Sequence, residues 1–130
     1  MSIQRLHTNA LMSQAVVHGG VVYLAGQVDL ESPAPTVAAQ TERILARIDD
    51  LLAQAGSDKS RLLTATIWLT DLSQFQAMNE VWNQWLPAGS APARATVQAG
   101  LALPGLLVEI AVTAAVAAAV GIDPAGPVAA

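Results

Sequence analysis

The chain has 130 residues, which suits a single domain with a moderate hydrophobic core. Only 12% of the residues are charged and the net charge is −4 with six Lys and Arg, which argues against a nucleic-acid partner and against an anionic membrane surface. The chain has no cysteine for disulfides or thiolate chemistry, its two histidines lack a metal-binding motif, and no signal peptide is evident, so we expect a soluble cytoplasmic protein without a metal site.

The first part of the chain favours short strands. Residues 3–7 can form an edge strand. Residues 13–18 and 21–27 predict a β-hairpin, because the two glycines between them supply the positive φ angles of a tight two-residue turn. Gly26 falls near the end of this run, where the backbone is expected to pass close to a ligand or to another chain.

A long helix and a strand are expected next. Apolar residues recur at helical spacing from Val37 to Ala55 and form one apolar stripe. Thr36 is the expected N-cap of this helix, and Gly56 follows where a helix often ends in a left-handed residue. After a polar connector, residues 62–69 alternate between apolar and polar faces and predict a strand.

A second helix follows this strand. Ser73 and Gln76 have the spacing of a capping box, which predicts that the helix begins at Ser73. Its apolar stripe includes Phe75, Met78 and Trp82. The spacing of the three tryptophans favours packing in the core or at an interface over a stacking platform for a base or a sugar.

Two further strands each carry one charged residue among apolar neighbours. Arg94 lies in the first strand, on the same face as Thr96, and Glu109 lies in the second. If the two strands form a hairpin with its turn near Leu101, Arg94 lies directly across from Glu109. The residues alone fit either an ion pair that holds the strand register or a functional pair.

The order of elements predicts the fold class. Strands, helix, strand, helix and two strands imply a two-layer α+β domain over residues 1–116, with two helices on one face of a mixed sheet. The other face, expected to carry Arg94, Thr96 and Glu109, also needs cover, and the low charge favours burial in an oligomer. Residues 117–130 are rich in Ala, Pro and Gly and are expected to form a flexible tail.

These segments resemble the RidA (YjgF-type) family of small proteins. The matching motifs are Val-Tyr-Leu-Ala-Gly-Gln (22–27), Thr-Ile-Trp-Leu-Thr-Asp-Leu (66–72), Pro-Ala-Arg (92–94) and Val-Glu-Ile (108–110). The Gln-Ala-Gly-Leu segment (98–101) looks closer to a divergent YoaB-like branch. The resemblance implies a chorismate-mutase-like α+β fold and a homotrimer whose sheets line a central barrel, with ligand clefts between subunits.

The resemblance also implies an activity and its residues. The family hydrolyses reactive 2-imino acids, such as 2-iminobutanoate and 2-iminopropanoate, to 2-keto acids and ammonia without a metal or organic cofactor. By this resemblance Arg94 holds the substrate carboxylate, Glu109 positions or deprotonates the attacking water, backbone at Gly26 and Thr96 lines the cleft, and Asn79 lies near it. A guanidinium suits the first role, because its planar fork matches a carboxylate bidentately.

Two departures from the family pattern keep other functions open. Family deaminases carry a serine where Ala25 stands and an aromatic hydroxyl where Met12 stands, so the cleft is expected to be more apolar here. The alternatives are a non-catalytic or regulatory protein that binds small carboxylates such as keto acids, and an oligomeric scaffold that uses exposed apolar surface. RNA-directed activity, also associated with the family, finds no support in a chain with so few basic residues.

Overall fold

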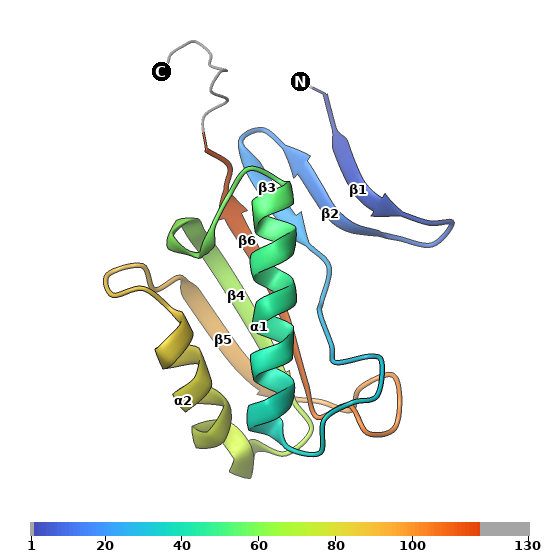
Figure 1. Ribbon diagram of the computed structural model, residues 1–130, viewed down its shortest axis with the longest axis vertical. Coiled ribbons are helices and arrows are strands. Elements are labelled where there is room, and N and C mark those ends of the chain that lie inside the picture. Colours follow the sequence, from blue (N-terminus) through green and yellow to red (C-terminus); the bar gives the residue numbers. More distant parts are fainter. Residues whose placement is uncertain (1, 118–130) are drawn as a thin grey trace.

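A computed structural model of the chain describes residues 2–117 and forms one six-stranded mixed sheet with two helices packed on the same face (Figure 1). The strands are β1 (Gln4–Thr8), β2 (Ser13–His18), β3 (Val21–Leu24), β4 (Leu62–Leu69), β5 (Ala93–Gln98) and β6 (Val108–Ala115), and the helices are α1 (Val37–Gln54) and α2 (Phe75–Trp85). Their order across the sheet is β1-β2-β3-β6-β4-β5. The predicted two-layer α+β architecture is therefore confirmed.

The predicted hairpin and first helix form for the physical reasons expected. Gly19 and Gly20 have φ angles of 62° and 80°, which close the tight turn between β2 and β3. The Thr36 hydroxyl accepts a hydrogen bond from the amide of Ala39 and caps α1, and Gly56 follows the helix with a φ of 81°. The apolar stripe of α1 is buried against the sheet, and it forms the core together with the inward-facing residues of β2, β3, β4 and β6.

The predicted start of the second helix is wrong by two residues. A 3₁₀ turn, η2 (Leu72–Gln74), precedes α2, and the helix itself begins at Phe75. The carboxylate of Asp71 caps this 3₁₀ turn by accepting a hydrogen bond from the amide of Ser73 at 2.9 Å, whereas Gln74, directly before α2, makes no side-chain cap hydrogen bond. An aspartate placed two residues earlier satisfies the first free amide, so Ser73 does not act as the N-cap.

The predicted hairpin between the last two strands is also wrong, because β4 lies between them. β5 pairs with β4 in parallel, whereas β6 pairs with the opposite edge of β4 in antiparallel orientation. The cause is the intervening helix: β4, α2 and β5 form a strand–helix–strand crossover, which returns the chain parallel to the strand it left. β5 thereby becomes the last strand of the sheet.

The predicted C-terminal tail (117–130) lies almost wholly outside the described residues, so the structure does not test this prediction. Neither of the helices found within residues 2–117 combines the length and the apolar character that crossing a membrane requires.

Candidate functional site

Arg94 points to the helix-covered face of the sheet and lies against α2. In the register it is the partner of Ala65 on β4, whose buried side chain belongs to the core. Its Nη1 atom donates a hydrogen bond to Oδ1 of Asn79 at 2.8 Å. The guanidinium carbon also lies 5.7 Å from the ring centroid of Phe75 and 5.4 Å from that of Trp82, which are cation–π distances. We call these four residues, Arg94, Asn79, Phe75 and Trp82, the arginine cluster.

The arginine cluster leaves a cation without a counter-ion. Within residues 2–117 the ion pairs are Arg43 with Asp29 and Arg61 with Asp58, so the Arg94 guanidinium has no carboxylate partner there. Partial burial lowers the pKa of Arg94, yet arginine stays protonated at neutral pH. One N–H bonds to Asn79 and the other donors remain available, so the cluster can receive a carboxylate.

Glu109 points to the other face of the sheet, on which neither α1 nor α2 packs. Its register partner on β4 is Trp68, which is half-buried. The Glu109 carboxylate lies directly over Gly26: a Cβ atom added at Gly26 would be only 1.9 Å from Oε2 of Glu109. Partial burial raises the pKa of the Glu109 carboxyl. The approach at Gly26 was predicted to be to a ligand or to another chain, whereas the group that lies beside it here is the Glu109 carboxylate of the same chain.

Backbone hydrogen bonds fix Gly26 beside Glu109. The amide of Gln27 donates to the carbonyl of Ile110 at 2.8 Å, and the amide of Ile110 donates to the carbonyl of Gln27 at 3.1 Å. Gly26 and Glu109 are the residues directly before this bonded pair. We call Gly26 and Glu109 the glutamate contact.

Gln40 of α1 holds the loop that leads into β6. Its buried side-chain Nε2 donates to the carbonyls of Ala34 and Gly105, both at 2.8 Å, and its Oε1 accepts from the amide of Leu107 at 2.9 Å. Because all three hydrogen bonds come from one buried side chain of α1, the loop that precedes Glu109 is held against this helix.

The expectation that Arg94 and Glu109 share one sheet face is wrong. Ala65 and Trp68, their partners on β4, lie three residues apart and so point to opposite faces of the strand. Thr96 follows Arg94 onto the helix face. Within a single chain, a small ligand held by Arg94 is therefore separated from Glu109 by the sheet itself.

Thr96 can contribute to a site through its backbone. Its hydroxyl is buried and lacks a hydrogen-bond partner among the described residues. β5 ends the sheet, and Ala99 donates its amide to Leu69 of β4, so strand alternation directs the Thr96 amide toward the free edge. The five predicted site residues thus fall into two groups: Arg94, Asn79 and Thr96 around α2 and β5, and Glu109 with Gly26 on the opposite face.

Two aromatic contacts of Arg94 were not predicted as part of the site. Phe75 was expected only in the apolar stripe of the helix, and Trp82 in the core or at an interface, although their spacing with Asn79 puts all three on one face of α2. The spacing could have indicated that Asn79 faces the sheet, but not which strand residue it meets. The two positions that depart from the family, Ala25 and Met12, lie directly before Gly26 and in the exposed β1–β2 turn.

Comparison with known proteins gives consistent matches over the whole described domain. Residues 2–116 match the family model described as Endoribonuclease L-PSP. The RutC family protein YoaB from Escherichia coli (strain K12) is 44% identical over 117 residues, which cover 89% of this chain and 100% of YoaB. The crystal structure of NMB1025, a YjgF family member from Neisseria meningitidis, superposes with a TM-score of 0.87 at 43% identity, covering 92% of this chain and 98% of that one. Reactive Intermediate Deaminase A, chloroplastic, from Arabidopsis thaliana is 36% identical over 91 residues, 66% of this chain and 48% of that protein.

Proposed function

Because the chain belongs to the YjgF/RidA family and is similar to its member YoaB, we propose that it hydrolyses 2-imino acids to 2-keto acids and ammonia without a cofactor. The observation that carries the proposal is the Arg94 guanidinium, which Asn79 orients and no carboxylate in the described chain neutralises. Similarity to a protein named as a reactive intermediate deaminase supports the same reaction class.

The proposed reaction needs orientation, a water and a proton carrier. Arg94 holds the carboxylate of the imino acid, which is adjacent to the electrophilic imine carbon. The substrate reacts as the iminium, whose nitrogen already carries the extra proton. Glu109 takes a proton from water as the water oxygen bonds to the iminium carbon, and the electron pair of the C=N bond moves to the nitrogen. Glu109 then gives this proton to the amine nitrogen, and as the C–N bond breaks the hydroxyl proton passes to Glu109 and on to solvent, which leaves ammonia and the keto acid. A raised pKa suits Glu109 to both steps, because a carboxyl group both accepts and donates a proton more readily when its pKa lies closer to the pH of the reaction.

We propose further that two copies of the chain complete each site, as homotrimers of this fold would allow. Arg94 and Glu109 lie on opposite sheet faces, so Arg94 of one copy would meet Glu109 of the next. The uncovered face supports this assembly, since it exposes Tyr23 (48%) and Val97 (43%) on a chain with few charges. The free edge of β5 also needs a cover.

An assay of imine turnover tests the proposed function. 2-Iminopropanoate or 2-iminobutanoate is generated in situ, and its consumption is followed for the wild type, Arg94→Ala, Glu109→Gln and the control Arg61→Ala, an exposed arginine paired with Asp58. We expect each site variant to lose about 100-fold or more in kcat/KM and the control to match the wild type. Equal turnover by wild type and Arg94→Ala would overturn the proposal. A monomeric mass in light scattering would overturn the two-copy site.

A second candidate, non-catalytic binding of a small keto acid, rests on Met12 and Ala25. Both replace polar groups that the deaminase pattern carries, while the arginine cluster is retained. Calorimetry with pyruvate and 2-oxobutanoate separates the two functions. Binding that depends on Arg94, in a protein without imine turnover, would support the binding function; turnover that depends on Glu109 would reject it.

A further inference from the structure

A polar pocket of about 320 Å³ opens between the β1–β2 hairpin and α1. Its lining comes from two strands and one helix and contains none of the residues of the arginine cluster or the glutamate contact. The lining residues are His7, Gln14, Arg47, Asp50, Leu51 and Gln54. The pocket combines a cation, an anion, an imidazole, two amides and one apolar side chain, so several polar groups that can orient a ligand converge on one concave space.

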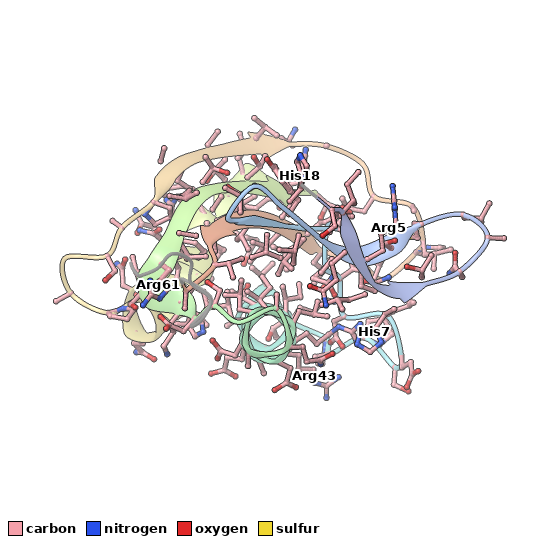
Figure 2. The ribbon with its side chains drawn as sticks, turned by 90° about the horizontal axis from the view of Figure 1, so that it is seen from above. Arg5, His7, His18, Arg43 and Arg61 are labelled. Carbon is pink, nitrogen blue, oxygen red and sulfur yellow. The ribbon has the colours of Figure 1, made fainter. Side chains whose placement is uncertain are left out.

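An unusual backbone conformation turns His7 into this pocket. Strand alternation would put Arg5 and His7 on the same side of β1, but Figure 2 shows them on opposite sides. The reason is the φ angle of His7, 52°, in the left-handed region that non-glycine residues adopt infrequently. The ring thereby reaches α1, where its Nε2 atom hydrogen-bonds to Oε1 of Gln54. Backbone in such a conformation is found preferentially where a side chain has a task.

A chain of hydrogen bonds orients Arg47 at the pocket wall. Its Nε atom donates to Oε1 of Gln27 at 3.2 Å, and Nε2 of the buried Gln27 donates to Oε1 of Gln14 at 2.9 Å. The bond to Gln27 uses the inner nitrogen of the guanidinium. The two terminal nitrogens make no hydrogen bond or ion pair within residues 2–117, so they can receive a ligand.

The charges of the pocket define the ligand that complements it. Arg47 and Asp50 lie three residues apart on α1, and such neighbours have Cβ atoms about 5–6 Å apart. Neither belongs to an ion pair in the described chain. A ligand that presents a carboxylate to Arg47 and an ammonium group to Asp50 would neutralise both charges at once.

We propose that this pocket binds a small free α-amino acid in its zwitterionic form. Arg47 holds the carboxylate and Asp50 the ammonium group, while the His7 ring and the Gln54 amide hydrogen-bond to polar atoms of the ligand. Leu51 contacts its side chain. The inference is independent of imine hydrolysis, since it uses none of the residues assigned to that reaction.

NMR titration tests this proposal, because it detects weak as well as tight binding. L-alanine and L-serine are added to the full chain, with lactate as the carboxylate that lacks an ammonium group and alaninamide as the amine that lacks a carboxylate. We expect both amino acids to perturb amides of the pocket, and both analogues to bind at least about tenfold more weakly. Failure of both amino acids to bind, or equal binding of lactate or alaninamide, would overturn the proposal.

Variants then locate the binding. Arg47→Ala and Asp50→Asn remove one charge each from exposed positions of α1 and are expected to weaken amino-acid binding about tenfold or more. Glu42→Gln, exposed on α1 outside the pocket, and Arg94→Ala are expected to bind as the wild type does. Loss of binding in Arg94→Ala would move the ligand to the arginine cluster and overturn the proposal. Circular dichroism confirms that each variant is folded.

Discussion

Arg94 and Glu109 are both partly buried charges on strands that flank β4, yet their surroundings differ. Arg94 has a hydrogen-bonded amide and two aromatic rings around it, whereas Glu109 makes no side-chain hydrogen bond within residues 2–117 and lies over a glycine. Burial disfavours the charged form of both side chains, so it lowers the pKa of Arg94 and raises that of Glu109. Each charge thus bears a desolvation cost without a counter-ion among residues 2–117 of its own chain, which a second copy or a ligand would offset.

Turnover should respond most strongly when Arg94, the arginine half of the proposed site, and Glu109, its glutamate half, are intact only on different chains. Arg94→Ala and Glu109→Gln are each expected to be inactive, but co-expression of the two variants should restore imine turnover. If the subunits of a trimer mix at random, about a quarter of the sites combine an intact Arg94 with an intact Glu109. Turnover of the purified mixed assembly checks this, with each single variant as control. No recovery in verified mixed assemblies would place both residues of a site in the same chain.

A change at Gly26 should affect the glutamate half alone. In Gly26→Ala the new Cβ atom must push the Glu109 carboxylate away, and the end of a flexible side chain can move without disturbing the fold. We expect turnover to fall about 100-fold with little change in the thermal midpoint. Gly100→Ala is the matched control, since a Cβ atom there meets nothing within 4 Å. Unchanged turnover in Gly26→Ala would remove Glu109 from the reaction.

Asn79 should affect the arginine half alone and by a smaller amount. Asn79→Ala removes the amide that orients Arg94 but leaves the guanidinium and both rings, so we expect KM to rise about tenfold while kcat changes little. Asn83→Ala, an exposed asparagine one helical turn later, serves as control. Steady-state kinetics of the three proteins separate KM from kcat. A fall in kcat at unchanged KM would contradict a positioning role through carboxylate binding.

Glu109→Gln should change the free energy of unfolding only slightly, and by an amount that depends on pH. Because burial raises the pKa of folded Glu109, the unfolded chain ionises first as pH rises, and the folded state loses relative stability until the pH exceeds the folded pKa. Where no cation of a neighbouring copy lies close to Glu109, Glu109→Gln should therefore match the wild type at about pH 3 and exceed its stability at about pH 7 by less than about 1 kcal/mol, because solvent screens this half-buried group. Urea unfolding at both pH values measures the difference. A loss of stability at neutral pH would mean that a cation reaches Glu109 in the assembled protein.

Short sequence patterns predicted most helices and strands, whereas the pairing of the strands depends on contacts between distant parts of the chain. The caps of α1 and the paired glycines act on neighbouring residues, so short sequence patterns were sufficient. The proposed pairing of Arg94 with Glu109 failed because strands adjacent in sequence were assumed to be adjacent in the sheet. The helix between β4 and β5 indicates a crossover connection, and this would have predicted that β5 pairs with β4 in parallel.

The composition of the site was predicted, but its division between two faces was not. The family motifs identify Arg94, Glu109 and Gly26 by residue type and spacing, which is local information. The contact between Arg94 and Asn79 depends on how α2 crosses the end of the sheet, and the turn of His7 toward α1 depends on one left-handed residue. Such arrangements arise from tertiary packing, so a single sequence carries little trace of them.

The contact of Gly26 with Glu109 has a consequence for how these positions can evolve. Every substitution of glycine adds a Cβ atom, and at this position that atom would overlap the Glu109 carboxylate. Gly26 is therefore expected to stay invariant in any lineage that retains Glu109 in its present position, whereas loss of Glu109 would allow other residues at position 26. Among descendants of this fold, a substitution of Gly26 should therefore be found only where Glu109 has changed as well.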